Sequence, residues 1–262
     1  MLENERLEQI LEMLKTQHTL SVRYLSKVLY VSEPTVRRDI KKLADEKLVR
    51  RVHGGITADF TMKSELLSYR LRETEMPEAK AFIAQMAARM VKQNDVIFLD
   101  STTTSAAIAR NLPNDLELKV ITTGIRPAEI LSERSIFTML AGGILAENAD
   151  DLTGYYTEMM LKDIHADIAF LSARGLSLDG RICTANIKGV PNFRLMMKNT
   201  KKAVLCLTSN KIGRDYFMTH EVIENVDEVL CDKPLPEELQ NRVGANRKQP
   251  AGDPYGAPQS NG

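Results

Sequence analysis

The first fifty residues place apolar side chains at the spacing of short helices. A first helix is predicted by apolar positions at i, i+3, i+4 and i+7, namely Leu7, Ile10, Leu11 and Leu14. A second helix is expected to begin after Thr19 or Ser21, either of which can cap its first turn. Its inward-facing residues are then Val22, Leu25 and Leu29. The pattern predicts a small helical unit at the start of the chain.

A third helix follows a tight connection. Ser32 is typical of a helix N-cap, and Pro34 is tolerated in a first turn because backbone N–H groups lack partners there. The buried stripe of this helix is Val36, Ile40 and Leu43. Its other faces carry Thr35, Arg37, Arg38, Lys41 and Lys42. Three short helices with a tight turn before the third predict a helix-turn-helix.

Residues 48–55 follow this helix and predict a short β-wing. The wing brings Arg50, Arg51 and His53, and its glycine pair, Gly54 and Gly55, allows a tight turn or a close approach to phosphates. A helix fits the major groove of DNA, where its first turns meet base edges and its cations reach phosphates. We expect Thr35 and Arg37 or Arg38 to contact bases, and Lys41 and Lys42 to contact phosphates. The full predicted DNA-binding set is Ser32, Thr35, Arg37, Arg38, Lys41, Lys42, Arg50, Arg51, His53 and Gly54. The alternative is a basic face that is simply solvated, but the helix and the wing together favour DNA binding.

The rest of the chain alternates strands with helices. Residues 57–76 are polar and poorly periodic, which predicts a linker. Residues 77–91 then predict a helix with Phe82, Ile83, Met86, Ala87, Met90 and Val91 on one face. Strand-length apolar runs follow at 96–99, 120–122, 136–140, 168–171, 203–207 and 229–230, and helical stretches at 106–112, 127–132 and 155–164 separate several of them. Continuous apolar strands separated by helices predict an α/β domain with a mostly parallel sheet.

Ligands of such sheets bind at the carboxyl ends of the strands, and polar loops follow several of these runs. The run 96–99 ends in Asp100, Ser101, Thr102, Thr103 and Thr104 just before a helix, where hydroxyls and free N–H groups suit an anion. Asp100 is suited to hold a sugar hydroxyl. An N-cap, which needs only one of these hydroxyls, is the alternative. Further candidates at strand ends and at the start of a helix are Thr123, Gly124, Gly142, Gly143, Gly154 and Lys211, the last of which could neutralise a phosphate or simply be solvated.

Composition and charge narrow the possible partners and the compartment of the protein. Residues 1–56 hold 11 Lys+Arg and 8 Asp+Glu, whereas the remaining residues hold 24 and 27, so the small basic unit is the one suited to phosphates. The charged start predicts no secretory signal, and no apolar run approaches the roughly 18 residues of a membrane span. The widely spaced Cys183, Cys206 and Cys231 fit reduced core thiols in the cytoplasm, and the four histidines show no ligand spacing. We expect a cytoplasmic protein without metal, cofactor or membrane partner.

Two sequence blocks carry a resemblance to a known family. The run from Val31 to Ile40 contains Ser32-Glu33-Pro34-Thr35-Val36-Arg37-Arg38-Asp39, and the wing contains Arg51-Val52-His53-Gly54-Gly55. Together they closely resemble the DeoR family of bacterial regulators, whose members carry such a recognition helix and an Arg-x-His-Gly-Gly wing. The resemblance implies that Arg37 and Arg38 serve DNA recognition. Asp39 is expected to orient a neighbouring arginine, because phosphates repel a carboxylate.

The resemblance extends over about residues 3–240 and into the second domain. The family's sensor domain is related in fold to ribose-5-phosphate isomerase, and its members usually respond to phosphorylated sugars or their catabolites. Its Asp-x-Gly-[Ser/Thr]-Thr loop corresponds here to residues 100–104, with Thr102 in place of the usual glycine. Thr123-Gly124 stands where Thr-Asn is usual, and residues 208–211 lack the acidic member of Asp-x-Ser-Lys. A glutamate that often precedes the equivalent of residues 193–197 is absent.

The sequence therefore predicts four segments: a winged helix-turn-helix at 1–56, a linker at 57–76, an effector-sensing α/β domain at 77–240 and a disordered tail at 241–262. We expect a transcription regulator, a repressor of a carbohydrate or related catabolic operon, whose partners are an operator in double-stranded DNA and a phosphorylated small-molecule effector. A homodimer or homotetramer is expected, because paired half-sites strengthen binding. The alternatives are a sugar-phosphate isomerase with a DNA-binding head, for which only Asp100 offers a general base, and a nonspecific nucleic-acid or protein-interaction module.

Overall fold

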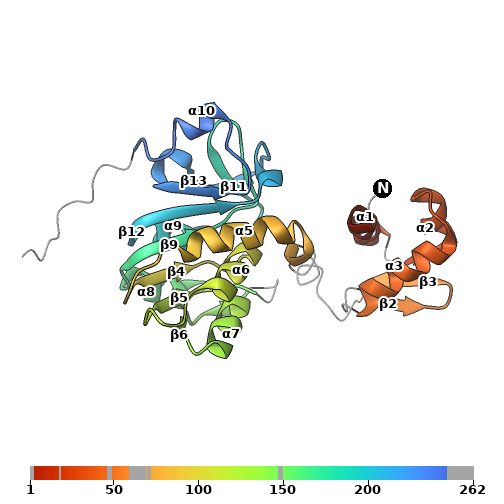
Figure 1. Ribbon diagram of the computed structural model, residues 1–262, viewed down its shortest axis with the longest axis horizontal. Coiled ribbons are helices and arrows are strands. Elements are labelled where there is room, and N and C mark those ends of the chain that lie inside the picture. The colour runs from red at the N-terminus through yellow and green to blue at the C-terminus, as the bar shows by residue number, and fades with distance from the viewer. Residues whose placement is uncertain are drawn as a thin grey trace, which may run out of the picture. The chain divides into compact units, whose positions relative to one another are not determined.

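The computed structural model describes residues 3–17, 19–45, 49–58, 69, 72–146 and 150–246 (Figure 1). The chain forms two compact units that meet in the sequence between Glu75 and Met76. Each unit has a hydrophobic core of its own. Within the described residues, no helix is long and apolar enough to cross a membrane. The expected tail at 241–262 lies outside the described residues from position 247 onward.

The N-terminal unit contains the three predicted helices and the wing. The helices are α1 (Glu3–Thr16), α2 (Val22–Val28) and α3 (Glu33–Asp45), and the strands are β1 (Thr19–Ser21), β2 (Val49–Val52) and β3 (Gly55–Ala58). The Ser21 hydroxyl caps α2 by accepting from the backbone N–H of Tyr24 at 3.1 Å. The residues predicted to face inward are all buried in one core. The sequence pattern did not predict β1, which joins the wing to make a sheet of order β1-β3-β2.

The two glycines of the wing are required for different structural reasons. Gly54 turns the chain between β2 and β3 with φ of +78°, a conformation that favours glycine. Gly55 pairs with Ser21 across the β1–β3 ladder and is buried, and a Cβ atom there would lie 2.2 Å from the carbonyl oxygen of Leu20. Of the two roles expected for the pair, the tight turn is confirmed at Gly54. Gly55 approaches the protein's own backbone.

The C-terminal unit is built on a six-stranded sheet of order β14-β12-β9-β4-β5-β6. All neighbouring pairs are parallel, which confirms the predicted parallel α/β domain. The strands are β4 (Val96–Leu99), β5 (Lys119–Thr122), β6 (Phe137–Leu140), β9 (Ala166–Leu171), β12 (Thr200–Leu207) and β14 (Glu228–Cys231). The connecting helices are α5 (Pro77–Ala88), α6 (Thr103–Asn111), α7 (Ile125–Glu133), α8 (Tyr155–Lys162) and α9 (Val190–Lys198).

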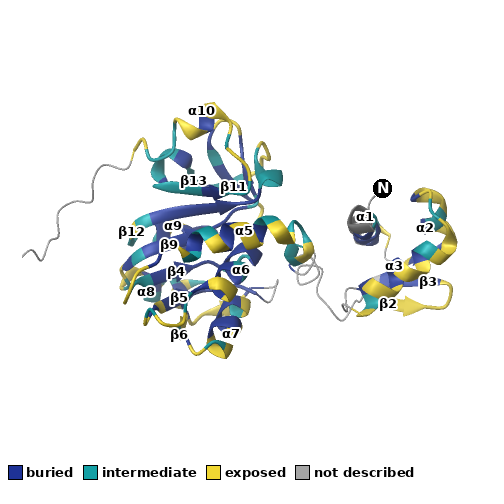
Figure 2. Ribbon diagram, viewed as in Figure 1, coloured by how far each residue is buried: buried dark blue, intermediate teal, exposed yellow. Residues whose placement is uncertain are grey.

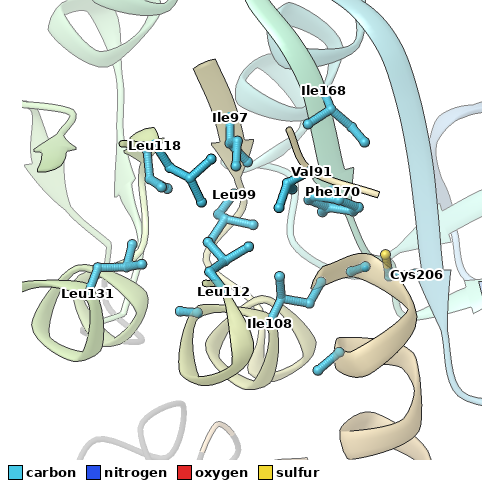
Figure 3. Close-up of a cluster of buried hydrophobic side chains, with 14 of the residues drawn as sticks. Val91, Ile97, Leu99, Ile108, Leu112, Leu118, Leu131, Ile168, Phe170 and Cys206 are labelled. Carbon is cyan, nitrogen blue, oxygen red and sulfur yellow. The ribbon is translucent and has the colours of Figure 1, made fainter. Parts of the chain in front are cut away.

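Alternate side chains of the central strands enter two separate cores. Ile97 and Leu99 of β4 belong to a cluster with residues of α5, α6 and α7, whereas Phe98 belongs to a cluster with residues of α8 and α9. Figure 3 shows the first of these clusters, in which β4 lies above Ile108 and Leu112. The central strands are accordingly buried on both faces (Figure 2). This burial explains why the strands appear in the sequence as continuous apolar runs.

Several parts of this unit differ from the sequence prediction or were not predicted. Phe82 does not share the buried face of α5, because half of it is exposed, while Ile83 and Ala87 are buried. Cys183 and Cys206 are buried as expected, but Cys231 is partly exposed, and all three are free thiols. The elements not predicted are β7 (Ile144–Leu145), β8 (Leu152–Thr153), β10 (Gly175–Leu176), β11 (Arg181–Thr184), β13 (Met218–Val222), α9, α10 (Glu237–Gln240) and two 3-10 turns at Ser209–Lys211 and Ile223–Asn225.

Candidate DNA-binding surface and effector site

Helix α3 presents its cations to solvent. Arg37, Arg38, Lys41 and Lys42 are exposed, while Val36, Ile40 and Leu43 are buried against the other helices. Ser32 and Thr35 lie at the start of the helix, where their hydroxyls are 2.9 Å apart. The Ser32 hydroxyl also accepts a long hydrogen bond of 3.4 Å from the Thr35 N–H, as an N-cap does. The surface has the geometry that a groove-binding helix requires.

The one acidic residue among these cations is held on the inner side. Asp39 is buried, and its two oxygens accept from Arg6 of α1, from Nε at 2.7 Å and from Nη2 at 2.9 Å. Such a two-point pair between partly buried groups is geometrically specific. Asp39 therefore orients an arginine, as expected, but this arginine belongs to α1. The pair ties α3 to α1 and keeps a negative charge away from the exposed basic face.

The exposed arginines are not locked into the protein. Arg37 forms an ion pair of 3.5 Å with Glu33, one turn earlier, and both side chains are about half exposed or more. An exposed pair of this kind contributes only about 0–1 kcal/mol, so it leaves Arg37 available. In the wing, Arg50, Arg51, His53 and Gly54 are all exposed. Among the ten predicted DNA-contact residues, only Thr35 is partly buried.

In the second unit, Asp100 organises the loop between β4 and α6. One of its carboxylate oxygens accepts from the Thr102 N–H at 2.9 Å and from the Ser105 hydroxyl at 2.6 Å. The other accepts from the Ser172 N–H at 2.5 Å, at the end of β9. Burial raises the pKa of Asp100, and the hydrogen bonds from Ser105, Thr102 and Ser172 oppose that shift. The buried Asp100 thus connects the end of β4 to the end of β9 through hydrogen bonds.

The hydroxyls of this loop do not all face the same way. Thr102 caps α6 by accepting from the Ser105 N–H at 3.2 Å, which is the role that the alternative interpretation gave to a single hydroxyl. Thr103 and Thr104 are buried in the first turn of α6. Ser101 is partly exposed and hydrogen-bonds Asp151.

A lysine lies at the same edge of the sheet. Lys211 ends the 3-10 turn after β12, and its Nζ donates to the Ser172 hydroxyl at 3.1 Å. Because the Ser172 N–H bonds Asp100, Lys211 is linked through one residue to the loop after β4. Asp232 at the end of β14 holds this turn by accepting from the Ser209 N–H at 2.6 Å and the Ser209 hydroxyl at 2.8 Å. Three strand ends therefore support the position of Lys211.

A second buried carboxylate lies beside the loop after β4. Asp151 hydrogen-bonds the hydroxyls of Thr123 and Ser101, and it forms an isolated antiparallel bridge with Gly124. Burial raises the pKa of Asp151 to about 7, with a smaller contribution from the charges of Asp100 and Asp150, and the two hydroxyls oppose it. Thr123 and Gly124 are thereby brought to the same place as Ser101, since a Cβ on Gly124 would lie 2.7 Å from the Ser101 Cα.

The remaining predicted glycines form a separate group. Gly142 accepts from the Thr157 hydroxyl of α8 at 2.7 Å, and a Cβ on Gly143 would meet that same hydroxyl. Gly154 lies against Ile144 with φ of +96°. These contacts explain the glycines by packing between the β7–β8 hairpin and α8.

Sequence reasoning missed three residues of this edge. Asp151 lies in an acidic stretch that resembles an exposed loop, and Asp150 beside it is buried as well. Ser172 directly follows β9, so the strand-end rule that selected Asp100 would also have selected it. The expectation that only Asp100 offers a carboxylate at this edge is wrong, because the buried Asp151 lies close enough for the charge of Asp100 to act on it.

A winged helix-turn-helix with an exposed basic recognition helix, followed by a parallel α/β domain with a polar edge, defines a DNA-binding transcription regulator. Family models agree: the DeoR-like helix-turn-helix domain matches residues 6–61 and the DeoR C terminal sensor domain matches residues 75–233. The chain belongs to the DeoR family of transcription regulators.

Known proteins resemble nearly the whole chain. The HTH-type transcriptional regulator GolR of Listeria innocua is 32% identical over 241 residues, which cover 91% of this chain and 94% of that protein. The glycerol-3-phosphate regulon repressor of Escherichia coli is 29% identical over 237 residues, which cover 90% of this chain and 93% of that protein.

Among solved structures, ribose 5-phosphate isomerase A from Methanocaldococcus jannaschii aligns with a TM-score of 0.40 and 18% identity over 52% of this chain and 54% of that one.

Proposed function

We propose that this protein represses a carbohydrate or related catabolic operon and that a phosphorylated sugar or similar small metabolite changes its affinity for the operator. Helix α3 and the wing bind the operator, and the effector binds at the carboxyl edge of the six-stranded sheet. For the effector to act, it must bind the DNA-competent and DNA-incompetent arrangements with different affinity. Relatives named as repressors of the glycerol-3-phosphate regulon and of a lactose phosphotransferase system support this direction of regulation.

The observation that carries the DNA-binding role is the separation of charges on α3. Arg37 and Arg38 are exposed. Asp39, the next residue in the sequence, is buried and forms an ion pair with Arg6 of α1. With Asp39 held inward, its carboxylate does not compete with DNA for these cations, and the exposed pair of Arg37 with Glu33 is weak. Thr35 and the two arginines reach base edges in this proposal, and Lys41 and Lys42 position the helix on phosphates.

The effector role rests on the mixed chemistry of the sheet edge. Lys211 supplies a positive charge and α6 supplies a helix N-terminus, and both suit a phosphate. Asp151, held beside Ser101 and Thr123, supplies a carboxylate that suits sugar hydroxyls. A phosphorylated polyol offers both kinds of group, with its phosphate toward Lys211.

Sequence preference can be tested with the intact chain. Repeated selection from a library of randomised duplexes gives a preferred sequence, and fluorescence anisotropy compares it with a shuffled duplex at fixed salt. Arg38→Ala is expected to weaken binding to the selected duplex by about tenfold or more, because a base or phosphate contact is lost. Arg89→Ala removes an exposed arginine at the end of α5 and should leave affinity unchanged. Equal affinity for the selected and shuffled duplexes would indicate the nonspecific module instead.

We propose that the sheet edge binds its ligand without catalysing a reaction on it. Both oxygens of Asp100 accept hydrogen bonds from the protein, so this carboxylate is engaged in structure and is not poised to take a proton from substrate. A thermal-shift screen of pentose and hexose phosphates should find a stabilising ligand. Assays of the same compounds for isomerisation should find no turnover, and turnover that Asp151→Asn abolishes would favour the isomerase.

A further inference from the structure

The two edges of the six-stranded sheet are protected to very different degrees. Strand β14 at one edge contains Glu228, and Asp232, Lys233 and Pro234 follow it directly. Charges and proline are common devices that prevent an edge strand from pairing with another chain. Strand β6 at the other edge has no such device, since residues 136–146 contain no charged residue in a chain that is 27% charged.

Strand β6 also has a free edge and is partly exposed on both of its faces. It pairs with β5 on one side, and no strand of the described residues pairs with its other side (Figure 1). Phe137 is 59% exposed, Met139 38% and Leu140 40%, whereas the central strands are buried (Figure 2). Because alternate residues of a strand point to opposite faces, these values describe an apolar strand that is partly exposed on both faces. A hollow of about 630 Å³ runs along its α7 side.

The apolar surface continues beyond the strand. The chain leaves β6 through Gly142, whose carbonyl bonds α8, and enters the β7–β8 hairpin. Ile144 of the hairpin is 70% exposed and lies 3.5 Å from the Cβ position of Gly154, at the start of α8. Tyr155 and Tyr156 follow there, with their rings edge to face at 5.7 Å, and both are about 70% exposed. We define the edge patch as Phe137, Met139, Leu140, Ile144, Tyr155 and Tyr156.

The size of the edge patch fits an interface between proteins. Aromatic side chains cover about 150–250 Å² each, so the exposed fractions of Phe137, Tyr155 and Tyr156 correspond to roughly 400 Å², to which the three aliphatic residues of the edge patch add. The largest apolar patch of a typical monomer is about 300–600 Å², and a stable interface buries about 800 Å² on each partner, including its polar rim. The edge patch can thus form the apolar centre of such an interface, and a polar rim would supply the remaining area.

We propose that the edge patch is a two-fold interface at which β6 meets β6 of a second copy of this chain. An uncharged patch can face its own copy without like-charge repulsion, and a two-fold axis brings two identical edge strands together antiparallel. The interface covers the apolar side chains and the unpaired backbone edge at the same time. It also supplies two copies of the recognition helix, as a paired half-site requires.

The test measures the mass of the full chain by sedimentation equilibrium over a range of concentrations. The wild type is expected to be a dimer or an even-numbered oligomer that contains this dimer. Phe137→Asp should weaken the association by about 30-fold or more, because a charge then faces its own copy in an apolar interface. Phe217→Asp is the matched control: Phe217 is 74% exposed and lies outside the edge patch, so this variant should associate like the wild type. Circular dichroism checks that each variant is folded.

Three results would overturn the proposal: a monomeric wild type, a Phe137→Asp variant that associates like the wild type, or an equal loss in Phe217→Asp. Should Phe137→Asp not fold, Tyr156→Asp at the start of α8 makes the same test on a different element. Hydrogen exchange of the wild type needs no variant at all. Backbone amides of β6 should gain protection as the protein concentration passes through the association range, and exchange independent of concentration would refute pairing at this strand.

Discussion

Asp151→Asn is expected to make the C-terminal unit more stable at neutral and alkaline pH. The carboxyl of Asp151 is buried beside Asp100 and Asp150, and its pKa is raised from 3.8 to about 7. Ionised Asp151 is therefore unfavourable in the folded protein and free of that cost in the unfolded chain. Asparagine has nearly the same shape, can still accept from Ser101 or Thr123, and carries no charge.

The magnitude follows from the shift in pKa. Between pH 3.8 and about 7 the folded protein holds a proton that the unfolded chain has released, so the free energy of unfolding falls as the pH rises through this interval. Above pH 7 the full cost is present, and a shift of this size corresponds to about 4 kcal/mol at most. Because neighbouring carboxylates share the cost, we expect the variant to gain about 2–4 kcal/mol at pH 8 and only about 40% of that gain at pH 5, where the pH has covered just the first part of the interval between 3.8 and about 7.

Thermal and urea unfolding of the full chain, followed by circular dichroism at pH 5 and pH 8, measure this difference. The N-terminal unit lacks Asp151, so its transition serves as an internal reference where the two units unfold separately. Asp115→Asn, which changes an exposed aspartate, is the control and should have no effect at either pH. An Asp151→Asn variant no more stable than the wild type at pH 8, or one that gains equally at both pH values, would refute the reasoning.

Four further substitutions test the remaining assignments. Gly55→Ala should destabilise the N-terminal unit by about 2 kcal/mol or more, because its Cβ would lie 2.2 Å from the Leu20 carbonyl oxygen, and Gly54→Ala by only about 1 kcal/mol; thermal unfolding compares them. Asp39→Ala should cost about 3 kcal/mol in the same unit by removing the two charge-assisted hydrogen bonds between Asp39 and the partly buried Arg6, and a loss below 1 kcal/mol on urea unfolding would contradict this. Lys211→Met should weaken a phosphorylated sugar about tenfold more than its unphosphorylated form, and calorimetric titration showing equal losses would remove the phosphate role.

The main sheet could be predicted from the sequence because its strands are buried on both faces. The run 96–99 coincides with β4, and the other five runs lie within or beside β5, β6, β9, β12 and β14. The small sheet of β10, β11 and β13 could not be predicted in the same way. Its strands are two to five residues long and include Arg181 and Glu221, so they show neither a continuous apolar run nor a long alternation.

The candidate effector site could be predicted only in part. Asp100 directly follows β4, and Lys211 lies four positions after the end of β12, so the strand-end rule found both. Asp151 does not follow a strand of the main sheet, and its burial results from pairing with Gly124, which is 27 positions earlier in the chain. From the sequence alone, two adjacent aspartates predict an exposed, solvated loop. Only the tertiary structure shows that both are buried.

The DNA-binding block illustrates why one sequence motif can indicate both a fold and a function. Asp39 and Gly55 belong to the block, yet both are buried and serve the packing of α1 and β1. Arg37 and Arg38 belong to it too, and both are exposed. A chain that retained only the buried pair would keep the winged helix and lose its basic face. The exposed residues therefore support DNA binding, and the buried ones support only the scaffold that presents them.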